Sequence, residues 1–153
     1  MNALPQLVSV GIVSLLAAGA TYWVKGPPVR KLACDVATLK PDEVCLQQIP
    51  ADAKVLWVDA RSRKEWQRDG LKGSVLWNLD PSEDMAAFEV KIVPLILETP
   101  RVIVYCGGEE CGLSRQVANR IRALDMGADV SVLRGGWDAL RDAGRVKDSN
   151  PAK

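Results

Sequence analysis

The order of apolar and polar positions divides the chain into an apolar N-terminal segment and a region of alternating strand-like and helix-like segments. Residues 4–24 form a stretch without a charged side chain. From residue 41 onward, short apolar runs typical of buried strands alternate with segments in which apolar residues recur at helical spacing. The strands are predicted over residues 55–58, 75–77, 102–105 and 130–133. This alternation predicts a small α/β domain with a largely parallel sheet and helices on both faces.

Helices are predicted between these strands from their starting residues and apolar faces. Pro41 suits the first turn of a helix and has two acidic residues behind it, so a helix is predicted over residues 41–48. Ser62 and Glu65 form a capping box for a short helix that ends near residue 67. Further helices are predicted over residues 80–95, over residues 114–124 and directly after residues 135–136.

The N-terminal segment is predicted to anchor the protein in a membrane. A helix over residues 4–24 would reach roughly 30 Å, which is enough to cross the hydrocarbon core. Tyr22 and Trp23 lie at its far end, where aromatic rings favour the membrane interface. Two alternatives remain open, namely a signal peptide cleaved near residues 18–20 and a buried core helix.

The predicted anchor implies membrane lipid as a partner and sets the division of the chain. Lys25, Arg30 and Lys31 follow the apolar segment, so the positive-inside rule favours a cytoplasmic domain, with a periplasmic or other extracytoplasmic location left open. The predicted parts are an N-terminal tip at residues 1–3, a transmembrane helix at 4–24, a linker at 25–35, the α/β domain at 36–142 and a flexible tail at 143–153.

Charge and residue counts exclude several classes of function. The chain has 20 Lys and Arg against 19 Asp and Glu, and this balance argues against a nucleic-acid binder. It has no histidine, which excludes Ser-His-Asp and Cys-His nucleophile pairs and zinc sites that need imidazole. A four-cysteine zinc site is not expected either, because the usual C-x2-4-C spacing is missing. No metal and no organic cofactor is implied.

The strongest candidate for chemistry is the loop that follows the third predicted strand. Cys106 stands at the end of that strand, before a glycine-rich loop that leads into a helix. Backbone N–H groups of such a loop, together with the positive end of the helix, stabilise a thiolate. This arrangement favours a nucleophilic cysteine that needs no histidine as its base. A buried structural cysteine before an ordinary turn is the alternative.

Over residues 36–142, the sequence resembles a rhodanese homology domain. The resemblance lies in six motifs in order: Val58-Asp59-Ala60-Arg61, Glu65-Trp66, the turn over residues 70–75, Val102-Ile103-Val104-Tyr105-Cys106, the helix over residues 114–124, and Val132-Leu133-Arg134-Gly135-Gly136-Trp137.

The resemblance implies a sulfurtransferase that carries sulfane sulfur as a persulfide on Cys106. Asp59 and Arg61 match a polar pair that usually holds this fold together. The partners implied are a sulfane-sulfur donor, either thiosulfate or a thiol persulfide, and a thiol or protein acceptor. The residues that would form the cradle around the sulfur are Gly107, Gly108, Glu109, Glu110, Cys111, Gly112, Ser114 and Arg115.

The loop departs from the common form of the family in length and charge. It is two residues longer, and Leu113 stands where an arginine commonly closes the cradle, so Arg115 is the nearest substitute. Glu109 and Glu110 would oppose a dianion by charge repulsion. A thiol persulfide is therefore favoured over thiosulfate as the donor, and a phosphatase or arsenate reductase is disfavoured.

The other cysteines leave alternatives open. Cys111 can act as a resolving thiol that attacks an oxidised or persulfide form of Cys106, which would make the pair a redox switch, or it can be a small loop residue. Cys34 and Cys45 could pair if the domain faces an oxidising compartment, but Cys45 also fits a core position of the helix predicted over residues 41–48. A non-catalytic binding module with the same fold is the third hypothesis.

Overall fold

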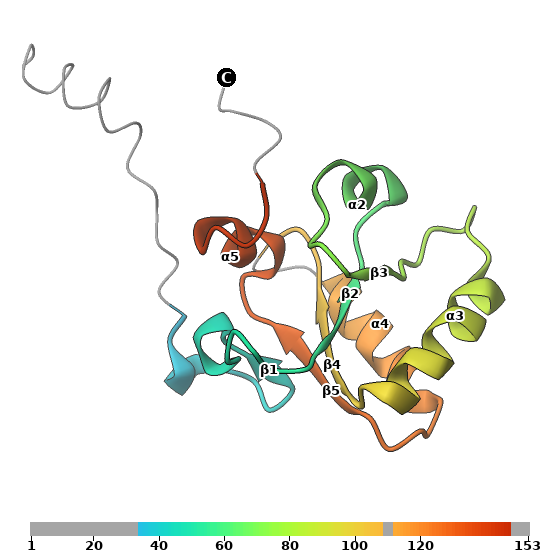
Figure 1. Ribbon diagram of the computed structural model, residues 1–153, viewed down its shortest axis with the longest axis horizontal. Coiled ribbons are helices and arrows are strands. Elements are labelled where there is room, and N and C mark those ends of the chain that lie inside the picture. The colour runs from blue at the N-terminus through green and yellow to red at the C-terminus, as the bar shows by residue number, and fades with distance from the viewer. Residues whose placement is uncertain (1–33, 109–111, 148–153) are drawn as a thin grey trace, which may run out of the picture. The chain divides into compact units, whose positions relative to one another are not determined.

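The sheet consists of five parallel strands in the order β1-β5-β4-β2-β3. A computed structural model describes residues 34–108 and 112–147 (Figure 1). The strands are β1 (Glu43–Val44), β2 (Leu56–Asp59), β3 (Val75–Leu76), β4 (Arg101–Tyr105) and β5 (Asp129–Leu133). The predicted α/β class and parallel sheet are therefore confirmed.

Helices cover both faces of this sheet, as the sequence predicts. Short 3-10 turns flank β1, and four α-helices follow along the chain. Their bounds are η1 (Val36–Thr38), η2 (Leu46–Gln48), α2 (Arg63–Asp69), α3 (Met85–Glu98), α4 (Gly112–Ala123) and α5 (Gly136–Asp142). Ser62 caps α2 by accepting a hydrogen bond from the Glu65 N–H, so the predicted capping box is present.

Strand β4 lies at the centre of the sheet and divides the core into two layers. Val102 and Val104 point to one face, where they join the cluster that α3 and α4 cover. Ile103 and Tyr105 point to the other face, where they pack in a cluster that includes α5 residues. Figure 1 shows α3 and α4 together on one side of the sheet and α5 on the other. Successive side chains of a strand point to opposite faces of the sheet, which explains this alternation. Residues 102–105 are apolar throughout because both faces of β4 are buried.

The helix predicted over residues 41–48 is wrong, because this segment contains strand β1 and the turn η2. Without β1, the hydrogen-bonding groups on the outer edge of β5 would lack a strand partner. The N–H of Val132 donates to the carbonyl of Asp42 at 2.8 Å, and that of Arg134 donates to the carbonyl of Val44 at 3.0 Å. Tertiary pairing therefore overrides the local helix signal at Pro41.

The predicted membrane helix at residues 4–24 lies outside the described residues, as does the end of the tail from residue 148. Within residues 34–108 and 112–147, no helix is both long and apolar enough to cross a membrane.

Candidate functional site

Cys106 lies at the carboxyl end of β4, the position expected for chemistry in a parallel sheet. It directly follows Tyr105, and only 2% of its surface is exposed. Its sulfur lies 3.5 Å from the Ser114 hydroxyl oxygen and 4.0 Å from the Gly108 carbonyl oxygen. The structure holds Cys106 in a disulfide-bonded state, so any reaction of its thiolate must start from the reduced protein.

Of the predicted cradle residues, the structure describes Gly107, Gly108, Gly112, Ser114 and Arg115. Gly112 begins α4, and Ser114 is buried on the first turn beside the sulfur of Cys106. The 12-residue helix therefore presents its positive end to Cys106, which favours an anion there. The predicted cradle residues Glu109, Glu110 and Cys111 lie outside the described residues.

The backbone of Cys106 is fixed by the turn before α5. The Trp137 N–H donates to the Cys106 carbonyl at 2.6 Å. Gly135 and Gly136 both have positive φ, at 78° and 52°, which lets the turn pass close to β4. A Cβ on Gly136 would collide with the carbonyl oxygen of Cys106. The Gly-Gly pair therefore brings α5 against the strand that carries the cysteine.

Replacing Gly136 with alanine should destabilise the domain by about 1–3 kcal/mol, because the collision adds to the backbone strain. A Cβ on Gly107, in the same region, meets no atom of the described residues within 4 Å, so Gly107→Ala is the matched control and should cost less than about 1 kcal/mol. Urea unfolding of both variants measures the difference. Equal stability of the two would contradict the contact between the turn and Cys106.

Arg115 contacts strand β1. Its guanidinium binds Asp42 at 2.9 Å and Glu43 at 2.7 Å. The hydrogen bond from Arg115 lowers the pKa of Asp42 against the effect of burial. For Glu43, burial raises the pKa, but the Lys40 N–H and Arg115 outweigh it and the pKa is lowered. The side chain that the sequence suggested for the rim of the cradle thus ties α4 to the edge of the sheet.

Asp59, Arg61 and Asp69 form a buried network beneath the site. Arg61 donates to both oxygens of Asp59, with its Nη2 at 2.9 Å, and its Nη1 lies 2.8 Å from Asp69. The side chains of Arg61 and Asp59 are 4% and 0% exposed, so their charges are compensated inside the protein and not by water. Asp59 and Asp69 together therefore compensate the buried charge of Arg61.

Tyr105 and Trp137, which belong to two of the motifs that carry the resemblance, connect this network to Cys106. The Arg61 guanidinium carbon lies 5.1 Å from the ring centre of Trp137 and 5.9 Å from that of Tyr105. The Trp137 indole N–H donates to the Asp69 carbonyl at 2.8 Å. Because Trp137 also holds the Cys106 carbonyl, Arg61 supports the site through one intervening residue.

Acid should weaken the fold through the carboxylates of Asp42, Glu43 and Asp69. The pKa of Asp69 is lowered although burial opposes this, because Arg68 and Arg61 donate hydrogen bonds to it. All three pKa values lie below the ordinary 3.8 or 4.5. Their contribution to stability is present above those ordinary values and is lost as the pH falls through the lowered ones. The free energy of unfolding should therefore decrease below about pH 4.5.

Urea unfolding between neutral pH and about pH 3 tests this dependence. Asp42→Asn removes one titrating group whose side chain is 26% exposed, so it should reduce the acid-dependent loss while the fold persists. An unchanged pH profile in Asp42→Asn would contradict the role of its pair with Arg115.

Asp138 is a further acidic residue near the cradle. A Cβ on Gly108 would lie 3.2 Å from its carboxylate oxygen Oδ2, so this carboxylate borders the loop. Arg141 pairs with Asp138 at 2.8 Å, which moderates its charge. The sequence places Asp138 in the first turn of α5, but only the close approach of that turn to β4 brings it to the loop.

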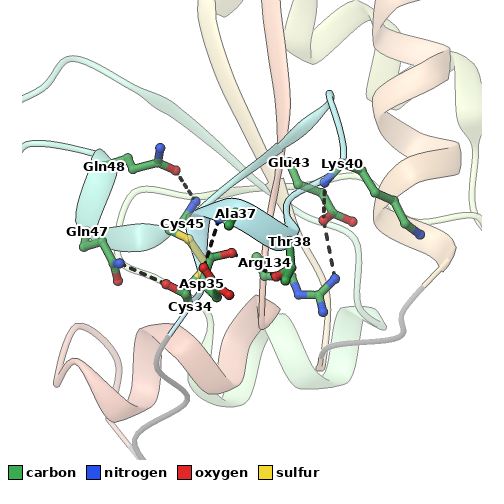
Figure 2. The surroundings of a disulfide bond; sticks show 10 residues. All are labelled: Cys34, Asp35, Ala37, Thr38, Lys40, Glu43, Cys45, Gln47, Gln48 and Arg134. Carbon is green, nitrogen blue, oxygen red and sulfur yellow. Dashed lines mark hydrogen bonds and ion pairs between the residues drawn. A yellow bond between two sulfur atoms is a disulfide. The ribbon is translucent and has the colours of Figure 1, made fainter.

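Cys34 and Cys45 form a disulfide, with their Cα atoms 5.7 Å apart. Figure 2 shows this cross-link between the start of the described chain and the segment after β1. The Gln47 side chain donates to the Cys34 carbonyl at 3.1 Å, and Gln48 accepts from the Cys45 N–H at 2.8 Å. The pairing that the sequence left open is therefore present.

The family model of the rhodanese-like domain matches residues 43–143. This is more than half of the chain, and the chain therefore belongs to the rhodanese-like domain family. The match confirms the resemblance and extends over all five strands of the sheet. No curated protein matches the chain.

Two solved structures with a TM-score of 0.50 show the same fold. The N-terminal domain of a Clostridium difficile 630 protein is 18% identical with a TM-score of 0.50, and the match covers 66% of this chain and 97% of that one. A Bacillus halodurans protein is 21% identical with a TM-score of 0.50 over 63% and 65% of the two chains. A thiosulfate sulfurtransferase from Pseudomonas aeruginosa is 26% identical with a TM-score of 0.41, and only 17% of its chain is covered, against 62% of this one.

Proposed function

We propose that the reduced domain is a sulfurtransferase that carries sulfane sulfur as a persulfide on Cys106. The observation that carries this proposal is the place of Cys106 at the carboxyl end of β4, with the start of α4 and the Ser114 hydroxyl at its sulfur. These groups stabilise a thiolate without a histidine base. Membership of the rhodanese-like family, which includes sulfurtransferases and non-catalytic members, supports the same function.

The reaction consists of two sulfur transfers that need no external oxidant. The Cys106 thiolate attacks the outer sulfur of a donor persulfide, the S–S bond of the donor breaks, and the donor leaves as a thiolate. Cys106 then holds the sulfur as a persulfide. An acceptor thiolate attacks that outer sulfur, and the electron pair of the broken bond returns to Cys106 Sγ.

A thiol persulfide fits the described part of the site better than thiosulfate does. Arg115 binds Asp42 and Glu43, so its charge is already compensated by two carboxylates. The carboxylate of Asp138 borders Gly108 and would repel a dianion. A thiol donor with little or no negative charge at the reacting end avoids this repulsion.

Intact mass spectrometry of the reduced protein tests the carrier function. After treatment with a persulfide donor and removal of the excess, the protein should gain the mass of one sulfur, and peptide mapping should place it on Cys106. Thiosulfate at the same concentration should load the protein more slowly. A protein that gains no sulfur from either donor would contradict the proposal and favour a non-catalytic binding module.

The disulfide-bonded state of Cys106 favours a thiol redox switch as the second candidate function. Cys34 and Cys45 pair with each other, so we propose Cys111, the fourth cysteine of the sequence, as the partner of Cys106. The Cys111 thiolate would attack Sγ of the Cys106 persulfide and release hydrosulfide as the disulfide forms. A loaded protein that loses its sulfur without an acceptor, and a Cys111→Ser variant that keeps it, would support the switch.

The Cys34–Cys45 disulfide also bears on the compartment in which the domain resides. Disulfides persist in oxidising compartments and are rare in the cytosol. We therefore propose an extracytoplasmic domain in place of the cytoplasmic one that the basic flank of the N-terminal segment favours. The three positive charges of that flank indicate the compartment less strongly than a covalent cross-link does.

Membrane attachment through residues 4–24 stays a prediction, and it can be tested together with the compartment. The full chain should stay in the membrane pellet through a high-salt or alkaline wash, because the attachment would be hydrophobic. After denaturation without reductant, Cys34 and Cys45 should not react with a maleimide, because they remain bonded to each other. Recovery of intact chain in the wash would exclude the anchor, and labelling of both cysteines would exclude the oxidising compartment.

A further inference from the structure

Helix α3 is apolar on the side that faces solvent as well as on the side that faces the sheet. Its inner side carries Phe88, Ile92 and Ile96, which are buried in the core. On its outer side, Val90 and Leu97 are 76% and 71% exposed, more than any other large apolar side chain of the described residues. A helix that is apolar all round is normally buried all round, so the outer side of α3 is expected to have a partner.

The exposed residues of α3 form one continuous face of the helix. At about 100° per residue, they fall within an arc of about 140°. Around that arc they are Ala86, Leu97, Val90, Pro94, Ala87, Glu98 and Lys91. The outer face of α3 is therefore an apolar surface with its two charged residues, Glu98 and Lys91, side by side at one margin. In Figure 1, α3 lies at the right-hand margin of the domain.

The two charges at this margin are not compensated within the domain. Within residues 34–108 and 112–147, neither Lys91 nor Glu98 forms a salt bridge. The Lys91 ammonium lies 5.8 Å from the ring centre of Trp66, so this margin is the one next to α2. Glu98 follows Lys91 by seven residues, or two helical turns, which places it roughly 10 Å further along the helix axis.

A positive and a negative charge at the same margin make the outer face of α3 complementary to itself. When two copies of a helix pack antiparallel about a two-fold axis, equal margins face each other, and residue i of each copy contacts residue j of the other. With the axis at the level of Pro94, Lys91 of each copy lies opposite Glu98 of the second copy, which gives two ion pairs. The same operation brings Val90 of each copy to within about one residue of the level of Leu97 of the second copy.

We infer that α3 forms the interface of a homodimer, in which a second copy of this chain covers the outer face of α3. A membrane surface fits this face less well, because helices that lie on lipid carry an excess of Lys and Arg beside an apolar side that often contains aromatic residues. The outer face of α3 has one charge of each sign and no aromatic residue. The inference depends neither on the function of Cys106 nor on membrane attachment.

The size of the face determines the strength of the expected association. The helix is roughly 20 Å long, so the contact is smaller than the about 800 Å² per partner of a standard interface. We therefore expect a reversible dimer with a dissociation constant in the micromolar range. Such a dimer dissociates on dilution.

Sedimentation of the full chain in a non-ionic detergent measures the dimer over protein concentrations of about 1–100 μM. Leu97→Glu should raise the dissociation constant at least tenfold, because it places a charge in the apolar contact. Val36→Glu is the matched control, since Val36 is an exposed apolar residue of η1 outside α3, and it should dimerise like the unaltered protein. Monomer at all concentrations, or an equal dissociation constant in all three proteins, would overturn the inference. Lipid or a different protein as the occupant of this face predicts one of these two results.

Reversal of the charges tests the antiparallel arrangement. Lys91→Glu and Glu98→Lys should each weaken the dimer about tenfold, because like charges then face each other across the interface. The variant with both substitutions should regain the original dissociation constant within about threefold, and so should an equal mixture of the two single variants. Failure of both to regain it would overturn the inference.

A carbodiimide, which joins an amine directly to a carboxylate, locates the contact. A mixture of chains labelled with ¹⁴N and ¹⁵N should give linked peptides that join Lys91 of one label to Glu98 of the other. In Leu97→Glu the yield of these mixed peptides should fall together with the dimer. Links between Lys91 and Glu98 that never join the two labels would overturn the inference.

Discussion

Serine in place of Cys106 should abolish persulfide formation and leave the fold intact. A hydroxyl is close in size to a thiol but is not ionised at neutral pH, and the buried position offers it the Ser114 hydroxyl at 3.5 Å as a polar neighbour. Turnover from a persulfide donor to cyanide or a thiol should fall to the background rate. Urea unfolding of the reduced proteins should differ by less than about 1.5 kcal/mol.

Ser114→Ala serves as the graded control, because it removes one group beside the sulfur and keeps the nucleophile. It should raise the pKa of the Cys106 thiol, since the thiolate loses a hydrogen bond, and slow the loading at neutral pH. Loading at a pH well above the thiol pKa should recover toward the rate of the unaltered protein. Thiocyanate production retained in Cys106→Ser would assign the sulfur transfer to a different cysteine.

The central part of the fold could be predicted from the sequence because its signals are local and agree with one another. The run from Val102 to Tyr105 is buried on both faces, so it is apolar throughout, and the capping box at Ser62 depends only on residues three positions apart. Cys106 could be singled out for the same reason, since the strand, the cysteine and the glycines are contiguous. Such features need no knowledge of distant contacts.

The features that could not be predicted depend on pairs far apart in the sequence. Strand β1 exists because β5 offers it hydrogen bonds, 89 residues away in the pair Glu43 and Val132, and no local pattern in two residues shows this. Arg115 stands near Cys106 in sequence, but carboxylates 72 and 73 residues earlier bind its guanidinium. Asp138 reaches the loop only because Gly136 lets α5 approach β4.

Replacing Arg61 with methionine should destabilise the domain by about 3–5 kcal/mol. Methionine keeps much of the volume of the side chain, so a cavity contributes little to the expected loss. The loss arises because Asp59, which is fully buried, would keep its charge without a guanidinium to compensate it. Arg68→Met is the matched control: Arg68 also binds Asp69, at 2.7 Å, but its side chain is 48% exposed, and its loss should cost about 1 kcal/mol or less.

The double variant Asp59→Asn/Arg61→Met distinguishes the loss of stability caused by the buried charge from that caused by lost packing. Neutralising Asp59 removes the uncompensated charge, so the double variant should be more stable than Arg61→Met alone, and a double-mutant cycle measures the coupling. Arg61 also stacks on Trp137, whose N–H holds the Cys106 carbonyl. If this connection positions the cysteine, the double variant should fold and still load sulfur more slowly than the unaltered protein. Equal loading rates in the double variant and the unaltered protein would show that Arg61 contributes to stability alone. A loss of stability in Arg61→Met no larger than that in Arg68→Met would contradict the contribution of the buried ion pair.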